Sequence, residues 1–272
     1  MQTISINFIV PHGWYELSDK QLRYVYQLLA DNFATDDKSC QREQSQACLD
    51  YAECSRFCWE EIKTLCLLQW TGTKVIGRQD SGAYLLKKGK ILFEVTPLTL
   101  AELLPHLDWL GSIPTVPVRL SKINRQHALP ADFSEVPFET FIICDNLYQG
   151  YLQTQNEDLL DQLGATLYGK SMAFKPYERI SIFYWFAALK DTFSRKFSDF
   201  FQPIADAATG GNLLGSASPS VEDAMNAQIR ALTKGDVTKE KEVLALDTHR
   251  ALTELNAQAR EYKELNAKTA SK

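Results

Sequence analysis

The sequence has no surplus of basic residues. It carries 29 Lys and Arg against 34 Asp and Glu, which gives a formal net charge of −5. A chain without excess cations has few groups that could displace counterions from the phosphates of a nucleic acid. Charges of both signs are also mixed along the chain, so the sequence defines no basic face. We therefore expect a protein that does not bind nucleic acid.

Long apolar runs are missing as well. The most apolar stretch, residues 180–189 (ISIFYWFAAL), is bracketed by charged residues and has about half the length of a membrane-spanning helix. The first residues, MQTISINFIVPHGW, include an apolar patch but lack the basic start of a signal peptide. We expect no membrane contact and a cytoplasmic location.

Patterns of metal ligands and catalytic residues are sparse. None of the six cysteines forms a C-x-x-C pair, and the four histidines lie far from them in sequence. Glu–His pairs at metal-ligand spacing are also absent. We interpret the thiols as structural and reduced, with a metal shared by Cys54 and Cys58, or a redox or disulfide role, as alternatives. We expect no metal, no cofactor and no catalytic residue. Five of the cysteines form a group: Cys40, Cys48, Cys54, Cys58 and Cys66.

One chemical motif is present. The stretch GATLYGKS, from Gly164 to Ser171, fits the phosphate-binding loop G-x-x-x-x-G-K-[ST] letter for letter. In such a loop Gly164, Gly169, Lys170 and Ser171 would contact a nucleotide. A genuine phosphate-binding loop follows a buried strand and opens a long helix, whose N-terminus faces the phosphates.

The residues around the motif do not match that context. The preceding stretch, NEDLLDQL, is acidic and has no β-branched residue, and leucines continue at helical spacing through Gly164 to Leu167. Pro176 follows soon after Lys170 and limits any helix that begins there. We interpret the motif as a helix that ends at Gly169, with Leu163 and Leu167 buried and no strand before it. Nucleotide binding remains the alternative.

The rest of the pattern predicts a predominantly helical α+β protein. Residues 4–8 alternate as in a half-buried strand, and Ser18 is suited to begin a helix. A polar stretch at 34–50 is typical of a flexible insert, and the following helix should end near Gly72. Short apolar runs separated by glycines then predict an antiparallel meander at 73–95.

The middle of the chain is predicted to be helical. After an irregular, proline-containing segment, one helix should begin at Pro137, and Thr154 with Glu157 forms the pattern of a capping box for the next. A stripe of aromatic and aliphatic residues then follows at steps of three and four. We interpret this stripe as core, with a partner-binding groove as the alternative. Its members are Ile182, Trp185, Phe186, Leu189, Phe193, Phe197 and Phe200.

The C-terminal part is predicted to be a tethered helical pair. Residues 1–205 would form the main domain, 206–219 a Gly/Ser-rich linker, and 220–272 a helical tail whose second helix runs without a break from 236. Two helices alone bury little, so we expect this tail to dock on a partner chain, on a second copy or on the main domain. Cutting at the linker would then leave a folded domain. The partner-binding candidates are Leu244, Ala251, Leu255, Ala259 and Tyr262.

Three stretches together resemble proteins encoded in tailed phages and prophages of the Bacteroidetes. They are FETFIICDNLYQGYLQTQNEDLLDQLGATLYG, FYWFAALKDTFSRKFSDFF and MNAQIRALTKGDVTKEKEVLALDTHRALTELNAQAREYKEL. The resemblance covers about the last half of the chain and includes no catalytic motif. It implies a tail-assembly-chaperone-like or minor virion protein, with other virion proteins or itself as partner, in the host cytoplasm or the virion. A phosphate-loop NTPase and an adaptor or regulatory protein of a mobile element are the alternatives.

Overall fold

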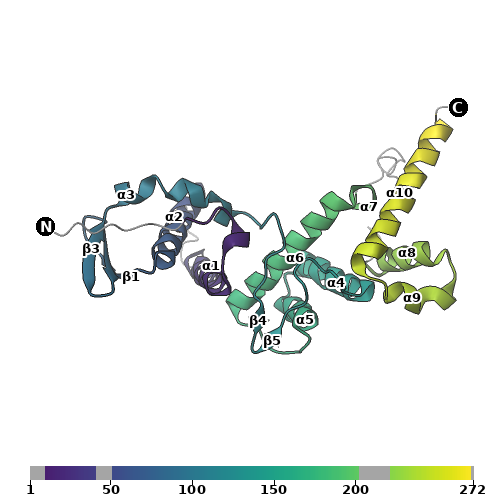
Figure 1. Cartoon of the computed structure of the whole chain (residues 1–272), viewed down its shortest axis with the longest axis horizontal. Helices are drawn as coiled ribbons and strands as arrows, with labels where there is room; N and C mark the ends of the chain where they lie inside the picture. Colours follow the sequence, from purple (N-terminus) through teal and green to yellow (C-terminus); the bar gives the residue numbers. More distant parts are fainter. Residues whose placement is uncertain (1–9, 41–50, 202–220, 271–272) are drawn as a thin grey trace. The chain divides into compact units, whose positions relative to one another are not determined.

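The computed structural model describes residues 10–40, 51–201 and 221–270, and their side chains except at 33–40, 51–58, 221–226 and 270 (Figure 1). The predicted strand at 4–8 and the predicted linker at 206–219 therefore lie outside the described residues. The fold class is as expected, namely helices with one small antiparallel sheet. The chain forms two compact units, Met1–Pro114 with Lys175–Ser181, and Thr115–Phe174 with Ile182–Lys272.

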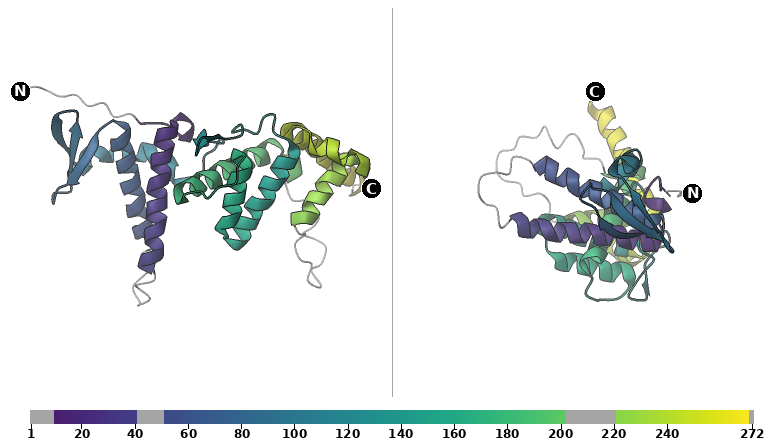
Figure 2. Two further views of the ribbon diagram at one scale, coloured as in Figure 1. Left: turned by 90° about the horizontal axis from the view of Figure 1, so that it is seen from below. Right: turned by 90° about the vertical axis from the view of Figure 1, so that its left-hand side faces the viewer.

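Unit 1 begins with a short 3₁₀ helix, η1 (Trp14–Glu16), and two long helices, α1 (Asp19–Cys40) and α2 (Tyr51–Trp70), which lie side by side (Figure 2). Ser18 begins α1 as predicted, because its side chain and that of Gln21 form a reciprocal capping box (Oγ–Oε1 2.7 Å). Since α1 extends to Cys40, the first part of the predicted insert at 34–50 is helical, which corrects that prediction.

The end of α2 also lies where the sequence places it. Gly72 has a φ of +70°, and the amide of Thr73 donates to the carbonyl of Leu68 (3.4 Å), as in a Schellman motif. The hydroxyls of Thr71 and Thr73 donate to the same carbonyl (2.6 and 2.7 Å). These three hydrogen bonds to one carbonyl end α2 and direct the chain into the sheet that follows.

The predicted meander is confirmed. Its strands are β1 (Lys74–Arg78), β2 (Tyr84–Lys88) and β3 (Ile91–Val95), hydrogen-bonded in the order β1-β2-β3. Leu86 on the central strand is fully buried, so one face of the sheet belongs to the core of unit 1. The chain continues through α3 (Pro97–Ala101) and the 3₁₀ helix η2 (Leu104–Gly111), which packs against α2.

Unit 2 opens with an irregular segment, as expected, that includes only the short hairpin of β4 (Lys122–Ile123) and β5 (Gln126–His127). The helices α4 (Phe138–Thr154), α5 (Glu157–Tyr168) and α6 (Pro176–Lys196) follow, and α6 belongs to unit 2 from Ile182 onward. The predicted capping box at Thr154 is wrong. Gln155 adopts a left-handed conformation (φ 55°) that ends α4, so Asn156 caps α5 by accepting from the amide of Asp158 (3.0 Å).

The aromatic stripe that begins in α6 and continues past its end at Lys196 is core, as predicted. Its members from Ile182 to Phe197 are each at most 3% exposed, and only Phe200 is half-buried. The rings of Phe133, Phe141 and Phe186 all contact one another, with centroids 6.2–6.4 Å apart. Edge-to-face aromatic contacts at this distance stabilise a core beyond the area that they bury.

The C-terminal helices depart from the prediction. They are α7 (Ser198–Phe201), α8 (Val221–Thr233), η4 (Val237–Lys239), α9 (Glu240–Leu244) and α10 (Thr248–Ala270), so the expected continuous helix from 236 is broken before Thr248. Asp247 makes the break: one carboxylate oxygen accepts from the amide of Arg250 (3.0 Å) and the other from Glu135 (2.8 Å). A helix N-cap and a tertiary contact thus share one side chain.

These helices are also part of a larger unit. The amide of Phe138 donates to Leu246 (2.8 Å), and the amide of Thr248 donates to Val136 (2.9 Å). Ala251 and Leu252 are completely buried. The sequence placed 1–205 in the main domain and 220–272 in a tethered tail, with docking of that tail on the main domain as one alternative. The compact units instead separate Met1–Pro114 and Lys175–Ser181 from the rest of the chain, and they join the C-terminal helices to α4.

Candidate functional site

The stretch GATLYGKS is the end of a helix. Gly164 lies inside α5, Leu163 and Leu167 are completely buried, and Gly169 ends the helix with a φ of +69°. The element before α5 is the helix α4, not a strand. The sequence-based interpretation of this motif is therefore confirmed in each of its geometric points.

Packing explains the first glycine of the motif. A Cβ on Gly164 would lie 2.6 Å from Cδ1 of Ile182 and 2.7 Å from the ring of Phe174. Both neighbours are buried, so α5 and α6 can approach closely only because Gly164 has no side chain between them. A phosphate cradle needs free, convergent amides, whereas the amides of a helix interior are already bonded. Lys170 and Ser171 follow on the exposed surface.

The described thiols are isolated. Cys66 on α2 and Cys144 on α4 are free and buried, and burial raises the pKa of both thiols above the ordinary value. Among the described side chains, no group of three His, Cys, Asp or Glu residues is placed to hold a metal ion. The alternative metal pair Cys54 and Cys58 lies outside the described side chains.

The buried thiols yield a prediction. Because alkylation requires the thiolate and access of the reagent, Cys66 and Cys144 should react with iodoacetamide about a hundredfold more slowly in the native protein than in urea. Site-resolved mass spectrometry of the alkylated peptides measures each cysteine separately. Rapid native labelling of Cys144 would show that the packing around α4 opens more readily than its burial indicates.

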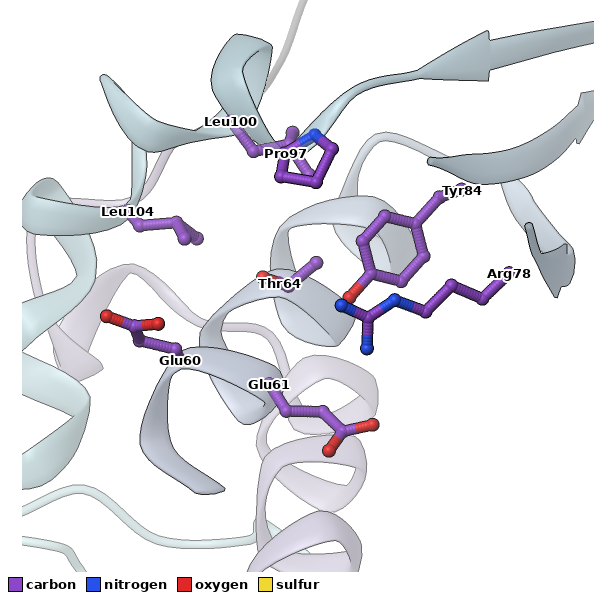
Figure 3. A pocket seen from close by; sticks show the side chains of 8 residues that line it. All are labelled: Glu60, Glu61, Thr64, Arg78, Tyr84, Pro97, Leu100 and Leu104. Carbon is purple, nitrogen blue, oxygen red and sulfur yellow. The ribbon is translucent and has the colours of Figure 1, made fainter. Parts of the chain in front are cut away.

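A shallow hollow lies in unit 1 between α2, the sheet and the α3–η2 segment (Figure 3). Its volume is about 100 Å³. Glu60 lies on the side of Leu104, and Glu61 lies on the side of Arg78. The guanidinium carbon of Arg78 is 5.4 Å from the centroid of the Tyr84 ring, a cation–π distance. The lining residues are Glu60, Glu61, Thr64, Arg78, Tyr84, Pro97, Leu100 and Leu104.

The chemistry of this hollow is limited. Glu60 and Glu61 are neighbours on one helix and are both exposed. Its eight lining residues include no histidine or cysteine. The hollow offers charged groups beside an apolar wall.

The partner-binding candidates differ in exposure. Ala251 and Leu255 are core residues of unit 2 (0% and 4% exposed), which corrects their assignment to a partner surface. Leu244 and Ala259 are half-buried. Tyr262 is 54% exposed, and Leu265, which the sequence analysis missed although it lies one helical turn further, is 62% exposed.

The part of α10 that carries these two exposed residues is held in place. Lys263 forms an ion pair with Asp199 of α7 (3.3 Å), and Arg260 lies 3.8 Å from the same carboxylate. The side chain of Asn256 accepts a hydrogen bond from the amide of Phe200 (3.0 Å). Tyr262 and Leu265 therefore project from a helix whose preceding turns are anchored on both polar and apolar contacts.

Comparisons with protein-family models, with curated proteins and with solved structures find no match to this chain. In the ranges that the structure describes, no helix combines the length and the apolar character needed to cross a membrane.

Proposed function

We propose that this protein is a non-enzymatic assembly protein of phage type, which acts through protein–protein contacts in tail assembly or as a minor virion component. The observation that supports action through protein–protein contacts is the apolar pair Tyr262 and Leu265, exposed on an anchored helix. The phage type is what the resemblance of the last half of the chain implies. Aromatic and aliphatic side chains one turn apart form one helix face and are typical anchors of an interface.

The geometry favours a partner that lays a helix along α10. The spacing of Leu255, Ala259 and Tyr262 continues the core stripe of this helix beyond the part that unit 2 covers. A partner helix could therefore extend the packing that α4 and α7 begin, and the ordered α10 would lose little conformational entropy on binding. We propose another virion protein, or a second copy, as the source of that helix, in the host cytoplasm or the virion.

The double variant Tyr262→Ser with Leu265→Ser tests this surface. We expect at least a tenfold loss of partner recovery, which corresponds to about 1.4 kcal/mol, because two anchor side chains are removed. The measurement is affinity capture from phage-producing cells, quantified by mass spectrometry, together with light scattering for self-association. Both side chains are exposed, so the unfolding temperature should stay unchanged.

A matched control is Val237→Ser in η4, where the valine is 79% exposed but lies outside this helix face. Recovery with this control should equal that of the unaltered protein. Equal recovery with the double variant would contradict the proposal. An adaptor protein of a mobile element would use the same surface, and it would capture host proteins instead of virion proteins.

A further inference from the structure

A second surface lies in unit 1, at the end of the sheet where α2 turns into β1. A hollow of about 410 Å³ opens there between the start of α1, the end of α2 and β1. Tyr24, Leu65 and Val75 are half-buried and form its apolar floor, while Lys20 and Lys74 stand exposed on its rim. We call this surface the lysine groove.

The sheet adds further lysines beside the groove. Lys87 on β2 lies directly opposite Lys74 in the strand register, and Lys88 and Lys90 follow at the turn into β3. All of them are exposed. The acidic residue of this sheet, Glu94, lies two rows further along, where it accepts a hydrogen bond from Gln79 (2.5 Å).

These lysines are electrostatically uncompensated. Within the described part of the chain, no carboxylate pairs with Lys20, Lys74, Lys87, Lys88 or Lys90. Like charges directly opposite in an antiparallel pair destabilise the sheet. An anionic ligand on Lys74 and Lys87 would remove that repulsion. Binding of an anion would therefore also stabilise the pairing of β1 with β2.

We propose that the lysine groove binds an acidic amphipathic segment of a partner protein. Apolar side chains of the segment would enter the hollow over Tyr24, Leu65 and Val75, and its carboxylates would pair with Lys20 and Lys74 on the rim. This site is distinct from the α10 surface and does not depend on the function proposed for it.

The composition of the groove distinguishes this partner from other anions. A nucleic-acid backbone offers phosphates but no aliphatic group to cover the apolar floor. An anionic bilayer favours a protruding apolar surface, whereas the apolar side chains of this site line a hollow. A peptide with leucines flanked by glutamates can cover the apolar floor with its leucines and pair its carboxylates with the lysines on the rim.

The test uses the full chain and a short fluorescent peptide in which glutamates flank two leucines. We expect saturable binding, measured by anisotropy, that weakens about tenfold in Lys74→Glu and in Lys20→Glu and weakens further with salt. Replacing the leucines of the peptide with serines should also weaken binding about tenfold, because the floor is then left without a partner. Lys241→Glu, an exposed lysine of α9, is the control and should bind as the unaltered protein does.

Both variants should fold. Lys74→Glu replaces a like-charge pair with a pair of opposite charges, so its unfolding temperature should rise. Lys20→Glu puts an acid into the first turn of α1, where the helix dipole favours it. Absence of saturable binding, equal binding of the serine peptide, or tighter binding of a double-stranded oligonucleotide or of phosphatidylserine vesicles would each overturn the proposal.

Discussion

Gly164→Val is expected to destabilise unit 2 by about 3 kcal/mol, since overpacking in a tight core costs about this much. The first atom of any side chain at this position would lie 2.6 Å from Ile182 and 2.7 Å from Phe174. Neither neighbour has free space to move into, because both are buried (0% and 4% exposed). Valine adds two further methyl groups at the same place, so α5 and α6 must separate or α5 must bend.

Urea unfolding followed by circular dichroism measures this effect, and Ala165→Val is the matched control. Ala165 lies on the same helix but is half-buried, so valine there should cost only its lower helix propensity, about 0.5 kcal/mol. If Gly164→Val and the control were equally stable, the close approach of the two helices would be wrong.

The same residues separate packing from nucleotide binding. If Gly164 is needed for packing, Lys170→Ala should leave stability unchanged, because Lys170 is exposed beyond the end of α5. Adding ATP or GTP with Mg²⁺ should then produce no thermal shift in either protein. A shift that Lys170→Ala abolishes would instead support the phosphate-loop NTPase and contradict the geometry of the motif.

Removal of residues 237–272 is expected to unfold unit 2. The deletion would take away Leu252 and Leu255, each worth about 2–5 kcal/mol when truncated to alanine, and would expose the core against which they pack. It would also leave the amide of Phe138 without its acceptor at Leu246. The total loss is comparable with the 5–15 kcal/mol by which a typical domain is stable.

Hydrogen exchange measured by mass spectrometry reports the outcome, because it resolves α4 and α6 separately from unit 1. We expect α4 and α6 to lose protection in the deleted chain. A shorter deletion that ends the chain after Glu264 is the control, since it retains the contact of Lys263 with Asp199. Retained protection of α4 after the long deletion would favour the separate tail that the sequence alone indicates.

The sequence by itself determined those features that depend on neighbouring residues. The capping box at Ser18, the helix end at Gly72, the meander at 73–95 and the buried stripe of α6 all lie where local patterns place them. Caps and turns follow from side chains a few residues apart, and a core stripe follows from helical period. The acidic, leucine-rich stretch before Gly164 likewise forms part of a helix and not a strand, as its pattern indicates.

Tertiary structure decided the features that depend on distant residues. Asp247 caps the start of α10 and also accepts a hydrogen bond from the amide of Glu135, a partner that no local pattern indicates. Ala251 and Leu255 are buried by packing inside unit 2. The sequence could not show this, because an apolar helical stripe has the same pattern whether its own domain or another protein covers it.

The clustering of charge at the lysine groove could not be predicted from the sequence either. Lys20 and Lys74 are far apart in a sequence whose charges are mixed, and the sequence analysis accordingly found no basic face. Strand pairing then sets Lys87 opposite Lys74, and the turn at the end of α2 brings both β1 and α1 to the rim of one hollow. Local sequence fixes which residues are charged, whereas only the fold decides which of those charges meet, because electrostatic interaction depends on distance in space and not along the chain.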